Sequence, residues 1–380
     1  MPSLKFYLKM MLHIVAETEK KMQRLKLDFG KRSYDIVINN SFDALSKELT
    51  NLCKGKILVV TDTNVALLYK DELSKVICAA GFDKPEFAVF KAGEKSKNID
   101  TIQRIYKSAI ESGFSREGTI IAFGGGVVGD IAGFVASTYM RGVNFIQIPT
   151  TLLAQTDSSV GGKVGFDFCG AKNIIGAFKQ PSLVYINTAS LKTLPKREFC
   201  SGMAEVIKYG IIKDEGFLTY LEKNNSAICD FDDDAIEDVI YNCCKIKADI
   251  VTEDETESGL RAILNFGHTI GHGIESAKNF SLLHGECVAL GMLCALDISL
   301  SRGYISADEA QRCKKIIAMY ELDTNVTNIN INAVATYMKN DKKKLCDTLR
   351  FVLVDGIGNA QIKDDVTNDE IEHALKCIMC

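Results

Sequence analysis

Three of the chain's five histidines, His268, His272 and His284, lie within a span of 17 residues. Imidazole is the commonest side-chain ligand for transition metals in proteins, so this clustering favours a metal site. On a helix, His268 and His272 are four residues apart and would project from one face. Glycines surround both, and each glycine inside a helix costs about 1 kcal/mol relative to alanine. We therefore expect another backbone or a ligand to approach this segment closely; a glycine-rich packing helix with buried histidines is the alternative.

A carboxylate earlier in the chain could complete such a site. Glu205 and Lys208 are three residues apart in a predicted helix and share one of its faces. One glutamate and two histidines would leave a fourth metal position open for substrate oxygens. Taken alone, the Glu205–Lys208 pair is better explained as a solvated salt bridge, so only its combination with the histidines indicates a metal.

A glycine-rich segment, Gly124 to Asp130, follows a predicted strand and opens a predicted helix. Its sequence, GGGVVGD, satisfies the G-x-G-x-x-G pattern, in which glycines let a pyrophosphate reach backbone N–H groups at a helix N-terminus. The ribose-binding acid usual about 20 residues later is missing. Asp62, which ends an earlier strand, could bind a ribose hydroxyl instead. We expect a dinucleotide bound outside the usual Rossmann order; a tight strand-to-helix turn is the alternative.

Polar groups are dense among the apolar residues of segment 141–163. The segment is not a Walker P-loop, because Lys163 is followed by Val164 rather than by serine or threonine. Lys172 and Asn173 add another cation and an amide shortly afterwards. This part of the chain is therefore a candidate for binding an anionic ligand.

Composition sets broad bounds on the protein. A chain of 380 residues suggests two domains, and 47% hydrophobic with 25% charged residues is typical of a soluble globular protein. The net charge of −4 gives no overall attraction for nucleic acid or an anionic membrane, so any cationic site must be local. Thirteen scattered cysteines favour free thiols in a reducing cytoplasm. The C-x-x-C formed by Cys377 and Cys380 lacks a second pair, and we interpret it as incidental.

Residues 1–21 are interpreted as an N-terminal extension. Their apolar stretch, 6–16, is interrupted by Lys9 and His13, and no small-residue cleavage site follows, so a signal peptide is not indicated. No run of 18 uncharged apolar residues exists, so no membrane span is expected.

Strand patterns alternate with helical patterns in the first half and then give way to helices. The predicted buried strands are 55–62, 86–90, 118–123, 144–148 and 182–186, with predicted helices at 65–80, 98–113 and 129–139. Later predicted helices are 197–224, 233–252, 258–278, 285–302 and 306–320, and 350–354 is a late strand. Alternation predicts a mostly parallel sheet covered on both faces. We expect a Rossmann-like α/β domain over 22–196, a mostly α-helical domain over 197–380, and an active site in the cleft between them.

Several long motifs resemble the 3-dehydroquinate synthase family of the sugar-phosphate cyclase superfamily. In order, they are GGGVVGD, MRGVNFIQIPTTLLAQTDSSVGGK, AKNIIGAF, TLPKREFCSGMAEVIKYG, LRAILNFGHTIGH and LLHGE. The resemblance runs from about Arg32 to near the end of the chain. It is specific because several long motifs agree in order and spacing. Segment 165–169 departs from the family's usual sequence, which implies a different loop detail around the substrate but removes no proposed ligand.

The resemblance implies a divalent metal, usually zinc with cobalt as the alternative, held by Glu205, His268 and His284. His272 then moves to a substrate-facing position. The resemblance also implies bound NAD. The implied NAD-binding residues are Asp62, Asn64, Glu94, Lys97, Gly125, Gly126, Asp130, Thr150, Thr151, Lys172 and Thr193.

The substrate implied by the resemblance is 3-deoxy-D-arabino-heptulosonate 7-phosphate (DAHP). The implied substrate-binding residues are Arg141, Lys163, Asn173, Lys208, Lys247, Arg261, Asn265, His272 and one of Lys342 and Lys343. The candidate catalytic residues are His272, Lys163, Asp157, Lys208 and Asn173. In relatives the counterpart of Arg141 reaches the phosphate across a dimer interface, which implies a homodimer here.

The implied reaction converts DAHP to 3-dehydroquinate and phosphate, a step of the shikimate pathway. It comprises transient oxidation by NAD, phosphate elimination, re-reduction and intramolecular aldol closure. The alternatives are another sugar-phosphate cyclase, such as 2-deoxy-scyllo-inosose synthase, or an NAD- and metal-dependent polyol-phosphate dehydrogenase. Segments 159–163 and 172–176 favour dehydroquinate synthase over the other cyclases. A dehydrogenase would lack the substrate-facing lysines and arginines and would release NADH stoichiometrically.

Overall fold

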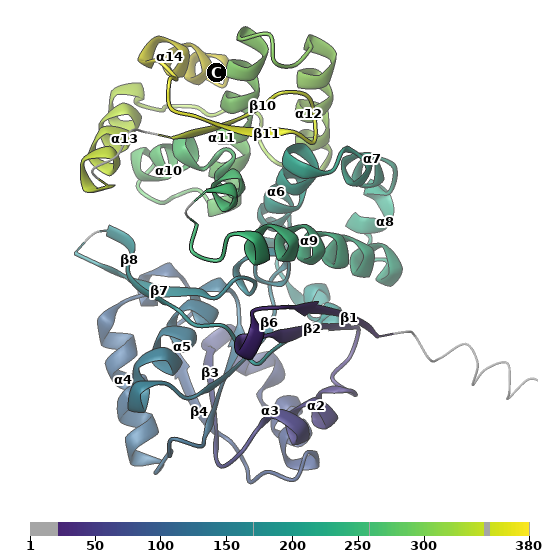
Figure 1. Cartoon of the computed structure of the whole chain (residues 1–380), viewed down its shortest axis with the longest axis vertical. Helices are drawn as coiled ribbons and strands as arrows, with labels where there is room; N and C mark the ends of the chain where they lie inside the picture. The colour runs from purple at the N-terminus through teal and green to yellow at the C-terminus, as the bar shows by residue number, and fades with distance from the viewer. Residues whose placement is uncertain (1–21, 170, 258, 346–349, 380) are drawn as a thin grey trace, which may run out of the picture.

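A seven-stranded sheet forms the N-terminal half of the protein, seen in the lower part of Figure 1. The computed structural model describes residues 22–169, 171–257, 259–345 and 350–379, without the side chains of 339–345. In order across the sheet, the strands are β1 (Gln23–Leu27), β2 (Tyr34–Asn39), β9 (Leu183–Asn187), β6 (Asn144–Pro149), β5 (Thr119–Gly124), β3 (Ile57–Asp62) and β4 (Glu86–Phe90). Only the β1–β2 pair is antiparallel, so the carboxyl ends of the other strands share one edge.

Helices cover both faces of the sheet because its strands are apolar on both sides. The helices of this half are α2 (Leu45–Leu52), α3 (Thr63–Ala79), α4 (Ile99–Glu111) and α5 (Gly126–Thr138). In β3, Leu58 belongs to the hydrophobic cluster beneath α4 and α5, whereas its neighbour Val59 belongs to the cluster beneath α2 and α3. This alternation is the period-2 pattern of a strand buried on both faces.

The C-terminal half is mostly helical. Its helices are α6 (Lys196–Lys213), α7 (Glu215–Lys223), α8 (Asn225–Cys229), α9 (Asp233–Glu253), α10 (His268–Ala277), α11 (His284–Ser301), α12 (Ala307–Met319), α13 (Ile331–Leu345) and α14 (Asn368–Cys377). A short hairpin, β10 (Phe351–Val354) with β11 (Ala360–Lys363), packs among them. Helix α11 is long and apolar enough to cross a membrane, but 72% of it is buried inside the protein, as expected for a core helix.

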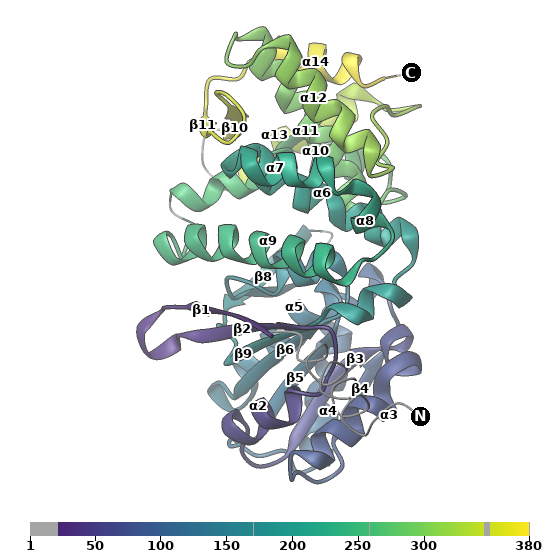
Figure 2. The same ribbon diagram turned by 90° about the vertical axis from the view of Figure 1, so that its right-hand side faces the viewer.

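Helix α9 lies between the two halves (Figure 2). It packs against β1 and β2 on one side and against α6 on the other. One hydrophobic cluster therefore runs from Ile36 in β2 through Val239 in α9 to Val206 in α6. The two halves share this core, which fixes the position of the helical half over one face of the sheet.

The fold class predicted from the sequence is confirmed: a mostly parallel sheet with helices precedes a helical part. Two predicted helices are each interrupted. The helix expected over 197–224 breaks at Asp214, whose carboxylate caps the backbone N–H of Phe217 in the next helix. The helix expected over 258–278 is a 3₁₀ turn, Leu260–Asn265, followed by α10.

In two strand pairs neither strand was predicted, and β11, the partner of the predicted late strand, was not predicted either. The first is the β1–β2 pair at the edge of the sheet. The second is an antiparallel hairpin of β7 (Lys163–Phe168) and β8 (Ala171–Phe178). This hairpin packs against α5 and carries two of the candidate catalytic residues, Lys163 and Asn173.

Candidate active site and metal centre

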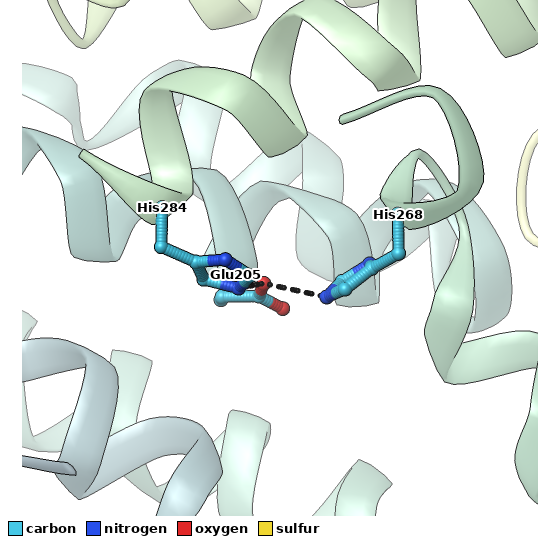
Figure 3. A group of neighbouring side chains, drawn as sticks. All are labelled: Glu205, His268 and His284. Carbon is cyan, nitrogen blue, oxygen red and sulfur yellow. Dashed lines mark ion pairs between the residues drawn. The ribbon is translucent and has the colours of Figure 1, made fainter. Parts of the chain in front are cut away.

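Glu205, His268 and His284 converge from three different helices, as Figure 3 shows. Glu205 lies within α6, whereas His268 and His284 are the first residues of α10 and α11. The Oε1 atom of Glu205 is 3.3 Å from Nε2 of His268 and 3.5 Å from Nε2 of His284. The three donor atoms all lie within 4.8 Å of one another.

Glycines allow these three helices to approach so closely. A Cβ atom on Gly285 would overlap the carbonyl oxygen of Ser201 in α6, and one on Gly291 would overlap the carbonyl oxygen of Gly267, just before α10. Gly267 itself adopts φ of +79°, which favours glycine. The close backbone approach expected from the glycine content of this segment is therefore present.

The donor set suits a zinc-class cation. Bonds of about 2.0–2.2 Å in a tetrahedral site place nitrogen and oxygen ligands roughly 3.3–3.6 Å apart, close to the distances seen here. Both carboxylate oxygens of Glu205 are buried and form no hydrogen bond of ordinary geometry with a described residue. Burial raises the pKa of Glu205, but Lys208 and His268 outweigh that effect and hold the pKa well below its usual value. An ionised buried carboxylate that faces two imidazole nitrogens is a ligand set that a cation would complete.

His272 belongs to a second, overlapping group. Its ring centroid is 5.4 Å from that of His268 and 5.8 Å from that of His284. His272, Glu275 and His284 could also hold an ion, so geometry alone offers two triads that share His284. Burial and the neighbouring imidazoles lower the pKa of His272 well below its usual value, so the ring is neutral.

Asp157 is the centre of a buried charge network beside the triad. It sits in a π-helical turn, Ala154–Ser158, and accepts a 2.6 Å hydrogen bond from the hydroxyl of Tyr209. Its Oδ1 atom is 2.9 Å from Nζ of Lys247 and 4.0 Å from Nζ of Lys208. Burial raises the pKa of Asp157, but these two lysines outweigh it and lower the pKa to about 2. Lys208 also contacts Glu205, which links this network to the candidate metal ligands.

Two more predicted substrate-binding residues, Lys163 and Asn265, contact Glu257, and a third, Arg261, contributes to the positive charge around Lys163. The carboxylate of Glu257 contacts the ammonium of Lys163 and accepts a 2.9 Å hydrogen bond from the amide of Asn265. Buried Arg261 donates a hydrogen bond to the carbonyl oxygen of Gly161, which lies two residues before Lys163 in the chain. Burial, with Arg261 and Lys247 nearby, lowers the pKa of Lys163 to about 8, whereas its contact with Glu257 works in the opposite direction.

Other predicted substrate residues stand apart from this cluster. Arg141 is exposed in a left-handed conformation, with φ of +67°. Asn173 is exposed on β8, and its backbone N–H donates to Asp167. Neither has a described contact with the charge network. The side chains of Lys342 and Lys343, near the end of α13, lie outside the described residues.

The residues predicted to bind NAD gather along one edge of the sheet. The segments that follow the carboxyl ends of β3, β4, β5, β6 and β9 carry Asp62, Asn64, Glu94, Lys97, Gly125, Gly126, Asp130, Thr150, Thr151 and Thr193. Ligands of open α/β sheets bind at this edge. A Cβ on Gly125 would lie 3.0 Å from Cγ2 of Thr151, so glycine keeps the start of α5 open. These residues fit a dinucleotide whose phosphates meet the N-terminus of α5.

Ion pairs connect the residues at this edge, and one of them, Lys172–Glu275, joins the edge to the helical half. Buried Lys97 lies 2.5 Å from Asp130. Burial by itself lowers the pKa of Lys97, but the nearby carboxylates, Asp130 first among them, outweigh burial and raise the pKa above its usual value. Lys172, from the β7–β8 hairpin, lies 2.8 Å from Glu275 in α10 and 3.9 Å from Glu94. The NAD-binding candidates and the histidine helix are therefore in direct contact through Lys172.

Tyr209, Glu257 and Glu275 were missed in the sequence, although each contacts a predicted residue. Tyr209 follows Lys208 directly, and Glu275 lies three residues after His272 on the same helix. Their closeness in sequence to Lys208 and His272 could have indicated that Tyr209 and Glu275 belong to the site. Glu257 offered no such signal, because its neighbours Lys163 and Asn265 approach it only through the fold.

Comparison with solved structures places the fold in a known class. The structure of a 2-epi-5-epi-valiolone synthase from Streptomyces hygroscopicus subsp. jinggangensis 5008, with NAD+ and Zn2+ bound, is 27% identical. It covers 91% of this chain and 96% of that one, with a TM-score of 0.85. A 2-deoxy-scyllo-inosose synthase, complexed with carbaglucose-6-phosphate, NAD+ and Co2+, is 23% identical, covers 93% and 99% of the two chains, and gives a TM-score of 0.84. Fold and site together define a sugar-phosphate cyclase.

Sequence comparisons narrow the class to one family. Residues 87–201 match the model for the 3-dehydroquinate synthase N-terminal region, and residues 202–344 match the C-terminal one. The 3-dehydroquinate synthase of Acetivibrio thermocellus is 47% identical over 333 residues, which cover 87% of this chain and 92% of that protein. The chain belongs to the 3-dehydroquinate synthase family, and the resemblance noted in its sequence is confirmed.

Proposed function

We propose that this chain converts DAHP to 3-dehydroquinate and phosphate, using NAD and a divalent metal, zinc, with cobalt as the alternative. The convergence of Glu205, His268 and His284 beside a buried network of cations carries the proposal. A cation held by those three residues would supply Lewis acidity toward substrate hydroxyls, and NAD would supply reversible oxidation of one of them.

The chain's own residues bind and orient an anionic substrate. Lys208, Lys247 and Arg261 supply positive charge in a buried setting, where charge-assisted hydrogen bonds to phosphate and carboxylate are strong. Lys163, which is exposed, adds a further positive charge beside them. Asp157 holds Nζ of Lys247 in place through a short contact of 2.9 Å. Positioning of this kind lowers the barrier by holding reacting groups in one geometry.

In this proposal, His272 is the residue that accepts and returns a proton during the reaction. A neutral imidazole can accept a proton, and burial keeps His272 neutral at physiological pH. A carboxylate oxygen of Glu275 lies within 4.8 Å of a ring nitrogen of His272, so its negative charge would stabilise the protonated ring. The phosphate of the substrate can assist its own elimination, so few protein bases are required.

Three further features belong to the same proposal. The protein acts as a homodimer, in which exposed Arg141 reaches the phosphate in the partner's site. One of Lys342 and Lys343 contacts the substrate. The enzyme works in the cytoplasm, in keeping with the 11 described cysteines, none of which forms a disulfide.

A single assay tests the proposal. Purified protein with DAHP and a catalytic amount of NAD should release phosphate and form 3-dehydroquinate without net accumulation of NADH. A chelator should stop the reaction, and added zinc or cobalt should restore it. NADH growing in proportion to product would instead identify a dehydrogenase. Turnover of glucose 6-phosphate in place of DAHP would point to a different cyclase.

A further inference from the structure

A second group of metal-ligating side chains lies far from the active site. Asp297 is near the end of α11, and His373 and Cys377 are four residues apart on α14, which packs against α11. Residues at i and i+4 share a helix face, so the imidazole and the thiol point the same way. His284 begins α11 13 residues before Asp297, which at 1.5 Å per residue puts the two sites about 20 Å apart.

The spacing of the donor atoms is that of a nearly formed tetrahedral site. Sγ of Cys377 is 3.7 Å from Nε2 of His373, and that nitrogen is 3.8 Å from Oδ2 of Asp297. With metal bonds of about 2.3 Å to sulfur and 2.0–2.2 Å to nitrogen or oxygen, tetrahedral ligands lie roughly 3.3–3.6 Å apart. All three donor atoms lie within 4.8 Å of one another, and His373 and Cys377 are exposed, so their side chains are free to adjust around an ion.

The local charge also favours a cation. Oδ2 of Asp297 is buried and lies 3.8 Å from Nε2 of His373, so a bound cation would compensate a charge that is costly to bury. A surface hollow of about 230 Å³, lined by Asp297, His373, Asp369 and Glu370 among others, leaves room for a fourth ligand.

We propose that Asp297, His373 and Cys377 form a second metal site for a zinc-class divalent cation. A thiolate, an imidazole and a carboxylate are zinc ligands, and the sulfur favours soft cations over magnesium or calcium. In the sequence, Cys377 is related only to Cys380, which lies outside the described residues, and that C-x-x-C spacing alone does not indicate a metal site. The fold brings two ligands to Cys377 that its local sequence does not show.

Cobalt distinguishes this site from the active site, because only one of the two contains sulfur. Titration of the full-length protein with Co2+ should produce a thiolate-to-cobalt charge-transfer absorption whose amplitude at saturation corresponds to one sulfur-bound Co2+ per chain, with the sulfur-free active site filling without contributing to this band. C377S should lose the band. H284A should keep it, although it lacks an active-site ligand. C78S, which replaces another exposed cysteine, is the matched control and should also keep the band.

Two more variants test the other ligands. D297N and H373A should each weaken Co2+ binding, followed by the same band, at least tenfold. Equal thermal unfolding midpoints for wild type and variants would show that the fold is intact. The proposal is overturned if wild type gives no band, if C377S retains it, or if D297N and H373A bind Co2+ as tightly as wild type. Turnover of DAHP does not enter this test, so the outcome is independent of the proposed function.

Discussion

The ammonium group of Lys208 contacts the carboxylate of Glu205 inside the protein, where the two residues are 2% and 1% exposed. Each charge is compensated by the other, and Glu205 also faces two imidazoles. A candidate metal ligand is therefore held ionised by a lysine before any cation arrives. This arrangement makes the effect of losing Lys208 depend on whether metal is present.

We predict that K208M destabilises the metal-free protein more than the zinc-loaded protein. Removing one partner of a buried ion pair costs about 3–5 kcal/mol, because the other charge stays buried alone. Bound zinc would compensate Glu205 and reduce that cost. Chemical denaturation with chelator or with zinc measures both free energies of unfolding. The double variant E205Q/K208M should recover part of the loss, and equal losses with and without zinc would contradict this account.

The two overlapping histidine triads make different predictions. If Glu205 and His268 hold the metal with His284, H268A should lower zinc affinity by more than about 100-fold, since even residues behind the ligands contribute 10–100-fold. H272A should retain zinc but lose turnover, by about 10²–10⁴-fold for a missing acid–base group. Metal content after dialysis and the rate of phosphate release separate the two. Loss of zinc from H272A with retention in H268A would assign the metal to the other triad.

Removing the hydroxyl of Tyr209 tests whether the charge network around Asp157 stabilises the fold, because that contribution to the free energy of unfolding depends on pH. Asp157 has a pKa of about 2 in the folded protein against 3.8 for an unperturbed carboxyl, so it stabilises the fold above pH 3.8 and that contribution is lost as pH falls toward 2. Y209F removes one hydrogen bond to this carboxylate. It should lower the free energy of unfolding at pH 7 by about 1.5–3 kcal/mol, the range for hydrogen bonds to charged groups.

The difference in the free energy of unfolding between Y209F and wild type should narrow as the pH falls below about 4, because the hydrogen bond from Tyr209 stabilises the ionised form of Asp157 and contributes less once Asp157 is protonated. Urea denaturation at a series of pH values between 3 and 7 gives both curves. A difference that stays constant over this range would mean that Tyr209 acts through packing alone.

Much of the sheet and many helices could be predicted because their signals are local. Segments such as 118–123 and 144–148 are apolar throughout, which is typical of strands buried on both faces. In the structure, α12 and α14 begin with capping boxes at Ser306 and Thr367, a local arrangement with its own sequence pattern, serine or threonine followed three residues later by glutamate. The β7–β8 hairpin lacked such a signal, because its residues are partly exposed and glycine-rich.

The site itself could be predicted only as a set of residues, since its geometry is non-local. Spacing could place His268 and His272 on one helix, but it could not decide which of them faces Glu205. The fold decides this, because α10 begins at His268 and α11 brings His284 alongside. The contacts of Glu257 with Lys163 and Asn265 likewise depend on loops whose meeting no local pattern predicts.

The contact between α10 and α11 offers a test of whether the fold sets the metal geometry. A methyl group on Gly291 would overlap the carbonyl oxygen of Gly267, the residue before His268, so G291A must push the start of α10 away. Overpacking of this kind costs about 1–3 kcal/mol, and here the obstacle is backbone that cannot change rotamer. We expect G291A to fold less stably and to bind zinc more weakly than wild type, although it changes no ligand.

The matched control for G291A is G216A in α7, where the added methyl group would meet only a side-chain oxygen of Asp214, at 3.1 Å. G216A should change the free energy of unfolding by less than about 1 kcal/mol, the usual glycine-to-alanine difference in a helix, and should leave zinc affinity unchanged. Zinc affinity can be measured by competition with a chelator under conditions where both variants are folded. If G291A binds zinc as tightly as G216A, the spacing of α10 and α11 does not determine where His268 and His284 meet the ion.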